Sequence, residues 1–574
     1  VGPHQSHGSV GMPPHSQAGP SAPPANVVPT SHVGPAHPHQ AHPQHIGLPG
    51  SSAAAPVIRD VSCALTLVAN GERFGVKMSG INDVFESAVR KIHGKDGETC
   101  RWDRESKTWS FSLHSHSEVK KALEDLKQVR CQVTPLHPFP LRIISHSIKS
   151  RAGEDEVAQR YAAIPAGMES KLMDFQKEGV KYILGLNGRG LIGDEMGLGK
   201  TVQALAVAAA YRDSWPVLII VPSTLRVQWS EQVHQWLGVT EEDVAVVANG
   251  KDLKSLSRTF VIVSYDLVSK LATDIAAVGF KCVICDEAHY IKNYKAKRSK
   301  DTVPLLQQAE RVVLLTGTPA LSRPLELFQQ LRALHPKQVR ALKEFGERYC
   351  AGGYNQYSLY SGASHLKELH KVVTSTTMVR RLKRDVLKQL PAKRREQIFL
   401  PITKAEQKAL SAVTDDLEEV KDMLNDSAGG TMAGMRTEQR LKINELYTKS
   451  GEIKAKAMCE YLKMLLDAEQ KFLIFAHHKC VLDRAECLMR EQKTKFIRID
   501  GSTPQGERAS LVHKFQEDEN VRVAVLSIRA AGVGLTLTAA SLVVMAELDW
   551  TPGNMVQAED RAHRIGQASS VNVH

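Results

Sequence analysis

The chain has 574 residues, of which 42% are hydrophobic and 24% are charged, and its formal net charge is +12. Such a length exceeds what one hydrophobic core can organise, so we expect two or three domains. The sequence contains no apolar run of about 18 residues, which excludes a membrane-spanning helix. The basic balance favours a polyanionic partner, although many proteins without such a partner are equally basic.

Residues 1–57 contain no Asp, Glu, Lys or Arg and are rich in Pro, Gly, Ser, Ala and His. Such a stretch cannot bury enough apolar surface to offset the entropy lost on ordering, so we predict a disordered tail. Its histidines could bind a metal, but a solvated linker is the simpler interpretation. Because no basic and then apolar leader follows Val1, we expect a fragment of a protein that is not secreted.

The nine cysteines are scattered, and only Cys282 and Cys285 have the spacing of a zinc half-site. They lie in an apolar run and no second pair accompanies them. We therefore interpret them as buried core cysteines in a reducing compartment.

Residues 58–140 predict a small α+β domain. Alternating apolar residues predict strands from Cys63 and Gly71, spacing predicts a helix over 81–92, and 102–113 has the pattern of a hairpin. A further helix, capped by Ser117, follows.

Basic and aromatic side chains of the predicted hairpin could form a nucleic-acid surface. Phosphate contacts and a stacking platform require these residue types, and the candidates are Arg101, Lys107, Trp109 and Phe111. The alternative is that the aromatic rings belong to the core and the basic residues to a solvated face.

A phosphate-binding loop is predicted over Leu191–Thr201, between a strand and a helix. Gly197 and Gly199 let backbone N–H groups approach phosphates, Lys200 can reach the terminal phosphates, and Thr201 can offer its hydroxyl to Mg²⁺. Asp194 stands where the usual pattern has its first glycine. The alternative is a structural glycine turn. The candidate ATP contacts in the loop are Asp194, Glu195, Met196, Gly197, Leu198, Gly199, Lys200 and Thr201.

A helix is predicted just before this loop, over 172–184. Gln176 in this helix could read the edge of an adenine, because its amide both donates and accepts hydrogen bonds. Exposed glutamines are nevertheless common in helices.

Continuous apolar strands follow the loop, and each ends at polar residues; they span 217–221, 260–265, 282–285 and 312–319. This pattern is typical of a parallel sheet that is buried on both faces, with its sites at the carboxyl ends of the strands. Asp286, Glu287, Ala288 and His289 come directly after one strand.

The acidic pair in this run predicts phosphoryl-transfer chemistry. Asp286 can hold Mg²⁺ through water, and Glu287 can orient and deprotonate the attacking water. Thr316 and Thr318 flank a glycine at the next strand end, which suits coupling between lobes or a plain tight turn.

The chain beyond 320 is mixed. The basic runs 380–386 and 393–395 could follow a phosphate backbone or form solvated helix faces, and 426–434 predicts a flexible break within a helical insertion.

A second α/β unit has predicted strands at 472–476, 496–501, 523–527 and 542–545. Arg561 and Arg564 lie three apart on a predicted helix face, from which they could stabilise charge on a γ-phosphate.

Two resemblances connect these motifs. The segment around Thr108–Leu113 resembles the HARP (HepA-related protein) domain. The ordered set of Gln176, 194–201, 286–289, 316–318, 532–534 and 557–567 resembles a superfamily-two helicase of the Swi/Snf-type branch, and with the HARP-like unit it resembles the SMARCAL-type annealing helicases.

The resemblance implies an α/β protein with two RecA-like lobes and parallel sheets, preceded by the tail and the small domain. The expected segments are a tail (1–57), a HARP-like DNA-binding domain (58–140), a linker (141–167), a first lobe with a helical insertion (168–395), a helical insertion and inter-lobe connector (396–455), and a second lobe (456–574). Because the chain stops at His574, within an apparent strand over 570–574, we expect the second lobe to lack its last elements.

The family pattern also implies residue roles. It places Gly534 at the ATP and Arg561 and Arg564 as catalytic arginines. Positions that face DNA or the lobe interface are implied for Ser223, Thr224, Trp229, Ser264, Tyr265, Thr316, Thr318, Asp500, Gly501 and Ser527.

The implied function is ATP- and Mg²⁺-dependent translocation on DNA, in the nucleus. The motor would rewind single strands and remodel or regress stalled forks, with branched, forked and single-strand/double-strand junction DNA as partners. The family recruits RPA, the single-stranded-DNA-binding protein, through a basic helix. No such helix is seen in residues 1–57, so that contact is expected only of a full-length parent.

Three other functions compete with this one. They are a nucleosome remodeller or generic duplex translocase of the same branch, an RNA helicase with an Asp-Glu-Ala-His box, and a DNA-binding scaffold without ATPase activity. The Gln557–Gln567 pattern disfavours the RNA helicase, and the intact acidic and basic motifs disfavour the scaffold.

Overall fold

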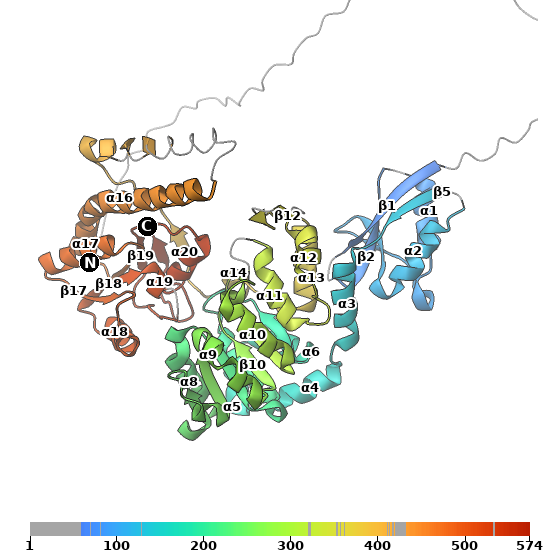
Figure 1. Ribbon diagram of the computed structural model, residues 1–574, viewed down its shortest axis with the longest axis horizontal. Coiled ribbons are helices and arrows are strands. Elements are labelled where there is room, and N and C mark those ends of the chain that lie inside the picture. The colour runs from blue at the N-terminus through green and yellow to red at the C-terminus, as the bar shows by residue number, and fades with distance from the viewer. Residues whose placement is uncertain are drawn as a thin grey trace, which may run out of the picture. The chain divides into compact units, whose positions relative to one another are not determined.

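The computed structural model describes residues 59–68, 71–80, 82–127, 129–319, 323–351, 354–355, 358–360, 362–409, 411–412, 414–415, 418, 432–531 and 534–574. The predicted tail with its histidines, most of the predicted break at 426–434, and Gly532 lie outside these residues. The described elements belong to the compact unit Ile58–His574 (Figure 1). None of the helices within these ranges is long and apolar enough to cross a membrane.

The small domain has a five-stranded sheet of order β3-β4-β2-β1-β5. All neighbouring strands are antiparallel except β1 and β5, which are parallel. Its elements are β1 (Arg59–Leu67), β2 (Arg73–Met78), α1 (Asp83–Lys91), β3 (Arg101–Asp103), β4 (Thr108–Ser112), α2 (His116–Glu124) and β5 (Val129–Thr134). The predicted hairpin and the helix over 81–92 are confirmed. Ser117 is not a cap, because α2 already begins at His116.

Residues 141–167, which we predicted as a linker, are mostly helical. They fall in α3 (Pro138–Ser150), α4 (Glu154–Ala162) and α5 (Ala166–Glu169). Pro138 and Pro140 suit the first turn of α3, where an N–H has no intrahelical partner. The apolar residues of α3 repeat with helical spacing, which the polar residues between them obscured in the sequence.

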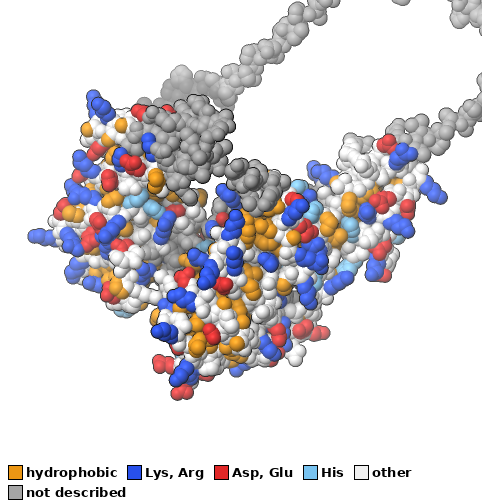
Figure 2. Space-filling view, in the orientation of Figure 1, with side chains coloured by type: hydrophobic (Ala, Val, Ile, Leu, Met, Phe, Trp, Pro, Cys, Tyr) orange, Lys and Arg blue, Asp and Glu red, His pale blue; other side chains and the backbone are white. Residues whose placement is uncertain are grey.

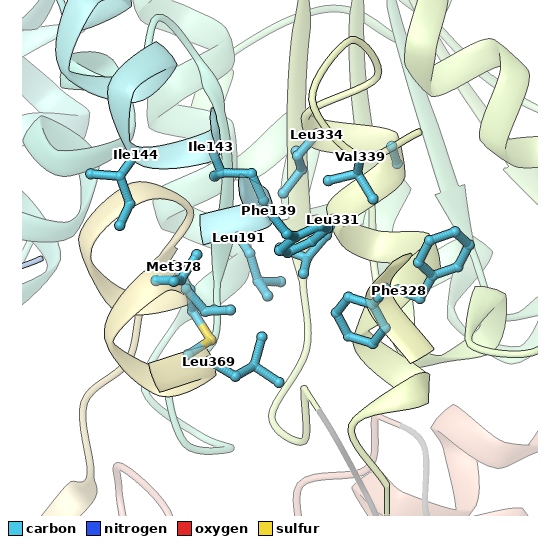
Figure 3. Packing of buried hydrophobic residues seen from close by; sticks show 14 of the residues in the cluster. Phe139, Ile143, Ile144, Leu191, Phe328, Leu331, Leu334, Val339, Leu369 and Met378 are labelled. Atoms are coloured by element: carbon cyan, nitrogen blue, oxygen red, sulfur yellow. The ribbon is translucent and has the colours of Figure 1, made fainter. Parts of the chain in front are cut away.

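The apolar face of α3 packs into the core of the first lobe, as Figure 3 shows. The Phe139 ring lies edge-on to the rings of Phe345 and Tyr349, with centroids 5.6 Å away in both cases. Arg142 donates to the carbonyl of Gln338 at 2.7 Å and pairs with Glu344 at 2.6 Å. A packed helix therefore joins the small domain to the first lobe.

The first lobe contains a seven-stranded sheet of order β14-β6-β11-β10-β7-β9-β8, in which all neighbours are parallel. Its strands are β6 (Arg189–Ile192), β7 (Val217–Val221), β8 (Val244–Val246), β9 (Phe260–Ser264), β10 (Cys282–Cys285), β11 (Arg311–Leu315) and β14 (Met378–Val379). The predicted apolar strands and parallel sheet are confirmed.

Helices surround this sheet, together with a short hairpin of β12 (Tyr354–Asn355) and β13 (Ser358–Leu359). They are α6 (Asp174–Gly185), α7 (Lys200–Ala210), α8 (Arg226–Leu237), α9 (Tyr265–Val278), α10 (Lys297–Gln308), α11 (Leu325–Leu334), α12 (Leu342–Tyr349), α13 (Leu366–Thr376) and α14 (Lys383–Val386).

The second lobe has a six-stranded parallel sheet of order β15-β20-β19-β16-β18-β17. Its strands are β15 (Lys393–Arg395), β16 (Phe472–Ala476), β17 (Lys495–Ile499), β18 (Val521–Ser527), β19 (Leu542–Met545) and β20 (Val571–Val573). Its helices are α16 (Met432–Asp467), α17 (Lys479–Glu491), α18 (Gln505–Glu517), α19 (Ile528–Ala531) and α20 (Pro552–Glu559).

The predicted end of the first lobe at 395 is wrong. Residues 393–395 pair with β20, so they belong to the second sheet and not to the first lobe. The predicted boundary at 455 lies within the 36-residue helix α16.

Replacement of Phe139 tests how firmly α3 holds the small domain. We expect Phe139→Ala to cost about 3–5 kcal/mol of unfolding free energy, because it leaves a cavity in the core shared with the first lobe. The thermal unfolding midpoint of the intact chain measures this loss. Phe399→Ala is the control, because Phe399 is 84% exposed and its removal should cost less than about 0.5 kcal/mol. Equal midpoints for the two variants would contradict the packing.

Candidate functional site

The phosphate loop follows β6 at the carboxyl edge of the first sheet. Gly197 and Gly199 have φ values of +84° and +72°, a left-handed backbone that favours glycine. A Cβ atom on Gly199 would lie 2.4 Å from Gln176 Nε2, and one on Gly197 would lie 2.8 Å from Arg564 Cβ. Both glycines are therefore required by conformation and by space.

The helix α7 starts at Lys200 directly after this loop, and Gly199 provides no capping side chain. The first N–H groups of a helix lack intrahelical acceptors, so they can bind an anion. Lys200 Nζ donates to the carbonyls of Asp194 at 3.0 Å and Glu195 at 3.4 Å. Burial lowers the pKa of Lys200, against the charges of Glu287 and Asp286. These donors fit a phosphate, and Thr201 follows them.

The Asp194 side chain is fully buried and does not face the space beside the loop. Its two carboxylate oxygens accept hydrogen bonds from Arg381 Nε at 3.0 Å and from the second guanidinium nitrogen at 2.6 Å. Gln203 Nε2 adds a third bond at 3.0 Å. The Asp194 side chain therefore anchors the loop, and the predicted contact of Asp194 with ATP is left to its backbone.

Gln176 is also occupied within the protein. Its Oε1 accepts from the Met173 N–H at 3.0 Å, and its Nε2 donates to the Leu198 carbonyl at 3.1 Å. In this arrangement the amide braces the phosphate loop, and reading an adenine would require both bonds to break.

The acidic motif follows β10, beside the phosphate loop. Asp286 Oδ2 accepts from Trp229 Nε1 at 2.8 Å, and Tyr265 donates its hydroxyl proton to the Asp286 carbonyl at 2.7 Å. Burial and the neighbouring Glu287 charge raise the pKa of Asp286 above its ordinary value. Glu287 itself adopts a φ of +47°, an uncommon conformation for a residue with a side chain.

A short polar chain leads away from Glu287. Glu287 Oε2 lies 3.1 Å from His289 Nδ1, which in turn lies 3.3 Å from the Thr316 hydroxyl. The Thr318 N–H donates to that hydroxyl at 3.1 Å. Burial alone would raise the pKa of Glu287, but the hydrogen bond and charge of His289, with Lys200 and Arg561, lower it. The predicted coupling turn thus lies within reach of the acidic motif.

The prediction that Arg561 and Arg564 share a helix face is wrong. The helix α20 ends at Glu559, and turns carry the chain through Arg561 and Arg564, with bonds such as Arg561 N–H to Ala558 O and Gln567 N–H to Arg564 O. Both guanidinium groups donate to the Leu535 carbonyl, at 3.4 and 3.3 Å.

Arg561 nevertheless lies close to the acidic motif. Burial and the Arg564 charge lower the pKa of Arg561 to about 10, while Glu287 and Asp286 act in the opposite direction. Gly534 packs against Leu225 of the first lobe, since its added Cβ would lie 2.3 Å from Leu225 Cδ2. The structure therefore brings the phosphate loop, the acidic motif and the arginines together.

The basic run 380–386 forms a clamp that neither predicted alternative describes. Arg380 donates to the carbonyls of Gly193 and Gly317 at 2.7 and 3.2 Å, and the Lys383 N–H donates to Glu195 at 2.7 Å. In the second run, Lys393 and Arg395 pair with Glu559 at 2.8 and 2.7 Å. The acidic partners are far away in the sequence, so only the fold identifies these contacts.

Five residues predicted to face DNA or the lobe interface line one cavity of about 450 Å³. Ser223, Thr224 and Tyr265 come from the first lobe, and Gly501 and Ser527 come from the second. Arg508 and Arg529 add positive charge, and Gln505 Nε2 donates to the Ser223 carbonyl across the lobes at 2.7 Å.

The other predicted residues of this set have internal contacts. Trp229 is buried against Asp286, Ser264 caps α9 through the Leu267 N–H, and Asp500 accepts from the Ser502 hydroxyl and pairs with Arg498. Trp229 therefore contacts the acidic motif, which leaves coupling as its predicted role in this arrangement.

The aromatic residues of the small domain divide into core and surface. Phe111 is fully buried against Phe74, so the prediction that it stacks on a base is wrong. Trp109 is half-buried and donates to Glu86 at 3.0 Å. Trp102 lies in the predicted hairpin but was not among the predicted site residues; it is 48% exposed and lies edge-on to Trp109.

Arg101 and Lys107 are exposed in the same hairpin as Trp102. We call Trp102, Arg101 and Lys107 the hairpin surface. Across the face shown in Figure 2, Lys and Arg side chains are interspersed with Asp and Glu.

The expected core role of the cysteine pair agrees with the structure, because Cys282 and Cys285 are both buried thiols. Among the described residues no group of three His, Cys, Asp or Glu side chains could hold a metal ion.

Two family models match the chain. The SNF2-related domain matches residues 175–467, and the helicase conserved C-terminal domain matches residues 453–566. A solved archaeal structure, the Sulfolobus solfataricus SWI2/SNF2 ATPase core in complex with dsDNA, is 24% identical, with 70% of this chain and 87% of that chain covered and a TM-score of 0.35.

Curated relatives are more similar in sequence. The Xenopus laevis SWI/SNF-related matrix-associated actin-dependent regulator of chromatin subfamily A-like protein 1 is 40% identical over 84% of this chain and 49% of its own length. The human DNA annealing helicase and endonuclease ZRANB3 is 43% identical over 72% of this chain and 38% of its length.

The Caenorhabditis elegans homolog of the subfamily A-like protein 1 is 36% identical over 88% of this chain and 71% of its own length. The chain spans about half the length of the frog relatives. With the SNF2-related model covering half of the chain and this relative covered over most of its length, the chain belongs to the SNF2-related family, among the relatives of the subfamily A-like protein 1.

Proposed function

We propose that the chain is a DNA-dependent ATPase that translocates on DNA, rewinds single-stranded regions and remodels or regresses stalled forks. The observation that carries this proposal is the convergence of Lys200, Glu287 and Arg561 from separate motifs of two lobes. The printed names of the relatives include a DNA annealing helicase, and a SNF2 core bound to dsDNA is among the similar structures.

Each group at the site has a role in ATP hydrolysis. The first N–H groups of α7 and the Lys200 ammonium bind the terminal phosphates. Glu287 orients a water and accepts its proton, while Arg561 and Arg564 stabilise the charge that develops on the γ-phosphate. The Thr201 hydroxyl and the Asp286 carboxylate would hold Mg²⁺, which supplies charge neutralisation at the phosphates.

Coupling of hydrolysis to DNA is assigned to the polar contacts that leave Glu287 and to the cavity with walls from both lobes. The chain of Glu287, His289 and Thr316 links the acidic motif to the next strand end. The cavity beside Ser223 and Ser527 has walls from both lobes, so its shape changes whenever the lobes move. A duplex phosphate backbone held there would advance with each cycle of hydrolysis.

Fork selection is assigned to the small domain. The hairpin surface combines an exposed aromatic ring with two cations, which suits stacking on unpaired bases and contacts to phosphates. Branched and single-strand/double-strand junction DNA are therefore the proposed partners, and the nucleus is the proposed location. A nucleosome remodeller or a generic duplex translocase is the alternative.

Glu287→Gln tests the ATPase proposal. The amide cannot accept the proton of the attacking water, so we expect DNA-stimulated ATP hydrolysis to fall by about 10²–10⁴-fold. Nucleotide binding should persist, as measured by equilibrium titration with a fluorescent ADP. Glu310→Gln, on the surface, is the control and should retain full hydrolysis. ATP hydrolysis at the wild-type rate in Glu287→Gln would contradict the assignment of Glu287 as the general base.

Trp229→Phe tests the electrostatics of Asp286. The Trp229 hydrogen bond lowers the pKa of Asp286 against the effect of burial, so its loss should raise that pKa further. Asp286 must be ionised to hold Mg²⁺, and hydrolysis therefore rises with pH through its pKa. We expect the acidic limb of the pH–rate profile to move to higher pH in Trp229→Phe, with the alkaline plateau unchanged. Trp236→Phe, whose indole donates to Gln232, is the matched control and should leave the profile in place.

A charge reversal on the hairpin surface separates fork remodelling from duplex translocation. We expect Arg101→Glu with Lys107→Glu to remove the preference for forked over plain duplex DNA in ATPase stimulation, at one fixed salt concentration. Stimulation by plain duplex should remain, because the motor site is untouched. Lys254→Glu with Lys270→Glu in the first lobe is a control of equal charge change. An unchanged fork preference would favour the generic duplex translocase.

A further inference from the structure

The segment that carries the two arginines is not held by a helix, so other contacts must fix its position. It runs from Asp560 to Gln567 through a series of turns. On one side His563 Nε2 lies 2.8 Å from the Pro391 carbonyl. Leu535 accepts from both arginines, Lys393 pairs with Asp560, and two further contacts come from Lys383 of the basic run 380–386.

Lys383 contacts both the phosphate loop and the arginine segment. Its N–H donates to Glu195 Oε2 at 2.7 Å, which ties its backbone to the loop. Its ammonium pairs with Asp560 Oδ1 at 3.0 Å and donates to the His563 carbonyl. Asp560 and His563 directly precede Arg561 and Arg564, so one buried cation holds the residue before each arginine.

The packing around Gly197 places the three parts together. A Cβ atom on Gly197 would lie 2.8 Å from Arg564 Cβ and 3.6 Å from Lys383 Cε. The Lys383 side chain is almost completely buried, so its contacts are desolvated and short. A movement of the phosphate loop is therefore transmitted to the arginines through Lys383.

We propose that Lys383 is a positioning residue for ATP hydrolysis, which sets the distance of Arg561 and Arg564 from the phosphate loop. This inference rests on the proposed ATPase function. Lys383 does not touch the reacting atoms, and it acts on the rate through the two arginines. Because its anchor is Glu195 in the loop itself, a change in the loop on nucleotide binding shifts the arginine segment.

Replacement of the Lys383 side chain does not leave a neighbouring carboxylate without a cation. Asp560 also pairs with Lys393 at 3.1 Å, and Glu559 pairs with both Lys393 and Arg395. An apolar side chain of similar length would therefore leave every acidic group of this cluster with a cation. The fold should survive such a replacement better than it would survive the loss of an isolated buried pair.

The test uses Lys383→Met in the full chain, with Arg384→Met as the matched control. Arg384 is the adjacent cation, its side chain is 81% exposed, and its nearest acidic partner is Asp385 at 3.5 Å. We expect kcat for DNA-stimulated hydrolysis to fall about a hundredfold in Lys383→Met, as for a small misplacement of catalytic groups. The Kd for ADP should change less than about threefold, because the phosphate loop keeps its own contacts. Arg384→Met should match the wild type.

A double variant separates positioning from a general structural role. If Lys383 acts through the two arginines, adding Lys383→Met to the double variant Arg561→Ala with Arg564→Ala should not slow hydrolysis further. Multiplicative losses would mean that Lys383 acts independently of the arginines, and a wild-type kcat in Lys383→Met would likewise overturn the proposal.

Two further measurements keep the outcomes distinct. If Lys383→Met unfolds at a lower temperature than the wild type, Lys383→Gln replaces it, because the amide retains a donor for the His563 carbonyl while the charge is lost. The same fall in kcat is expected for Lys383→Gln, and full activity would overturn the proposal. If the wild-type chain shows no DNA-stimulated hydrolysis, the proposed function itself is contradicted. If the wild type is active and Lys383→Met is folded and equally active, only the role of Lys383 is contradicted.

Discussion

The buried ion pair between Asp194 and Arg381 is the constraint on which the candidate site depends. Asp194 is fully buried at the base of the phosphate loop, and both of its oxygens bind one guanidinium group. A buried carboxylate is strongly unfavourable without such a partner, so the loop and the segment around Arg381 must meet for the lobe to fold. Once this pair forms, Arg380 and Lys383 reach Gly193 and Glu195 on the same loop. Asp194, which stands where the usual pattern has a glycine, thus joins the phosphate loop to the segment around Arg381.

From this pair, buried charges continue to the second lobe. Lys383 reaches Asp560, Lys393 links Asp560 to Glu559, and the arginine segment follows. Burial is the main cause of the shifted pKa values of Lys200, Asp286 and Arg561, and the neighbouring charges add to or oppose each shift. A bound nucleotide adds negative charge at the place where these cations converge. In the proposed ATPase, binding would therefore strengthen contacts between the two lobes, and loss of phosphate would weaken them.

The parts of the fold that the sequence predicted are those with a strong local pattern. The strands Val217–Val221, Cys282–Cys285, Phe472–Ala476 and Leu542–Met545 have the predicted bounds, because a continuous apolar run between polar residues is decided by burial alone. The errors lie where distant partners decide the structure. Arg561 and Arg564 have helical spacing, yet they lie in turns, because contacts from Lys383 and Leu535 hold them there. Trp102 and Phe111 lie on the same face of one hairpin, but Trp102 is on the edge strand β3 and Phe111 is on the inner strand β4, so only the order of strands in the sheet determines which ring is buried. The clamp of Arg380, Arg381 and Lys383 gave no local signal, since its acidic partners are far away in the chain.

The helix α3 gives the small domain a mechanical role that a flexible linker could not provide. Phe139 lies among the rings of Phe345 and Tyr349, and Arg142 binds Glu344 and the Gln338 carbonyl. Lys371 of α13 also donates to the Leu67 carbonyl at the end of β1, so the contact involves the sheet as well as the helix. In the proposed motor, a domain fixed in this way would move with the first lobe during each cycle of hydrolysis. If the hairpin surface holds unpaired bases, translocation by the motor then acts directly on the junction, because no slack linker lies between the two.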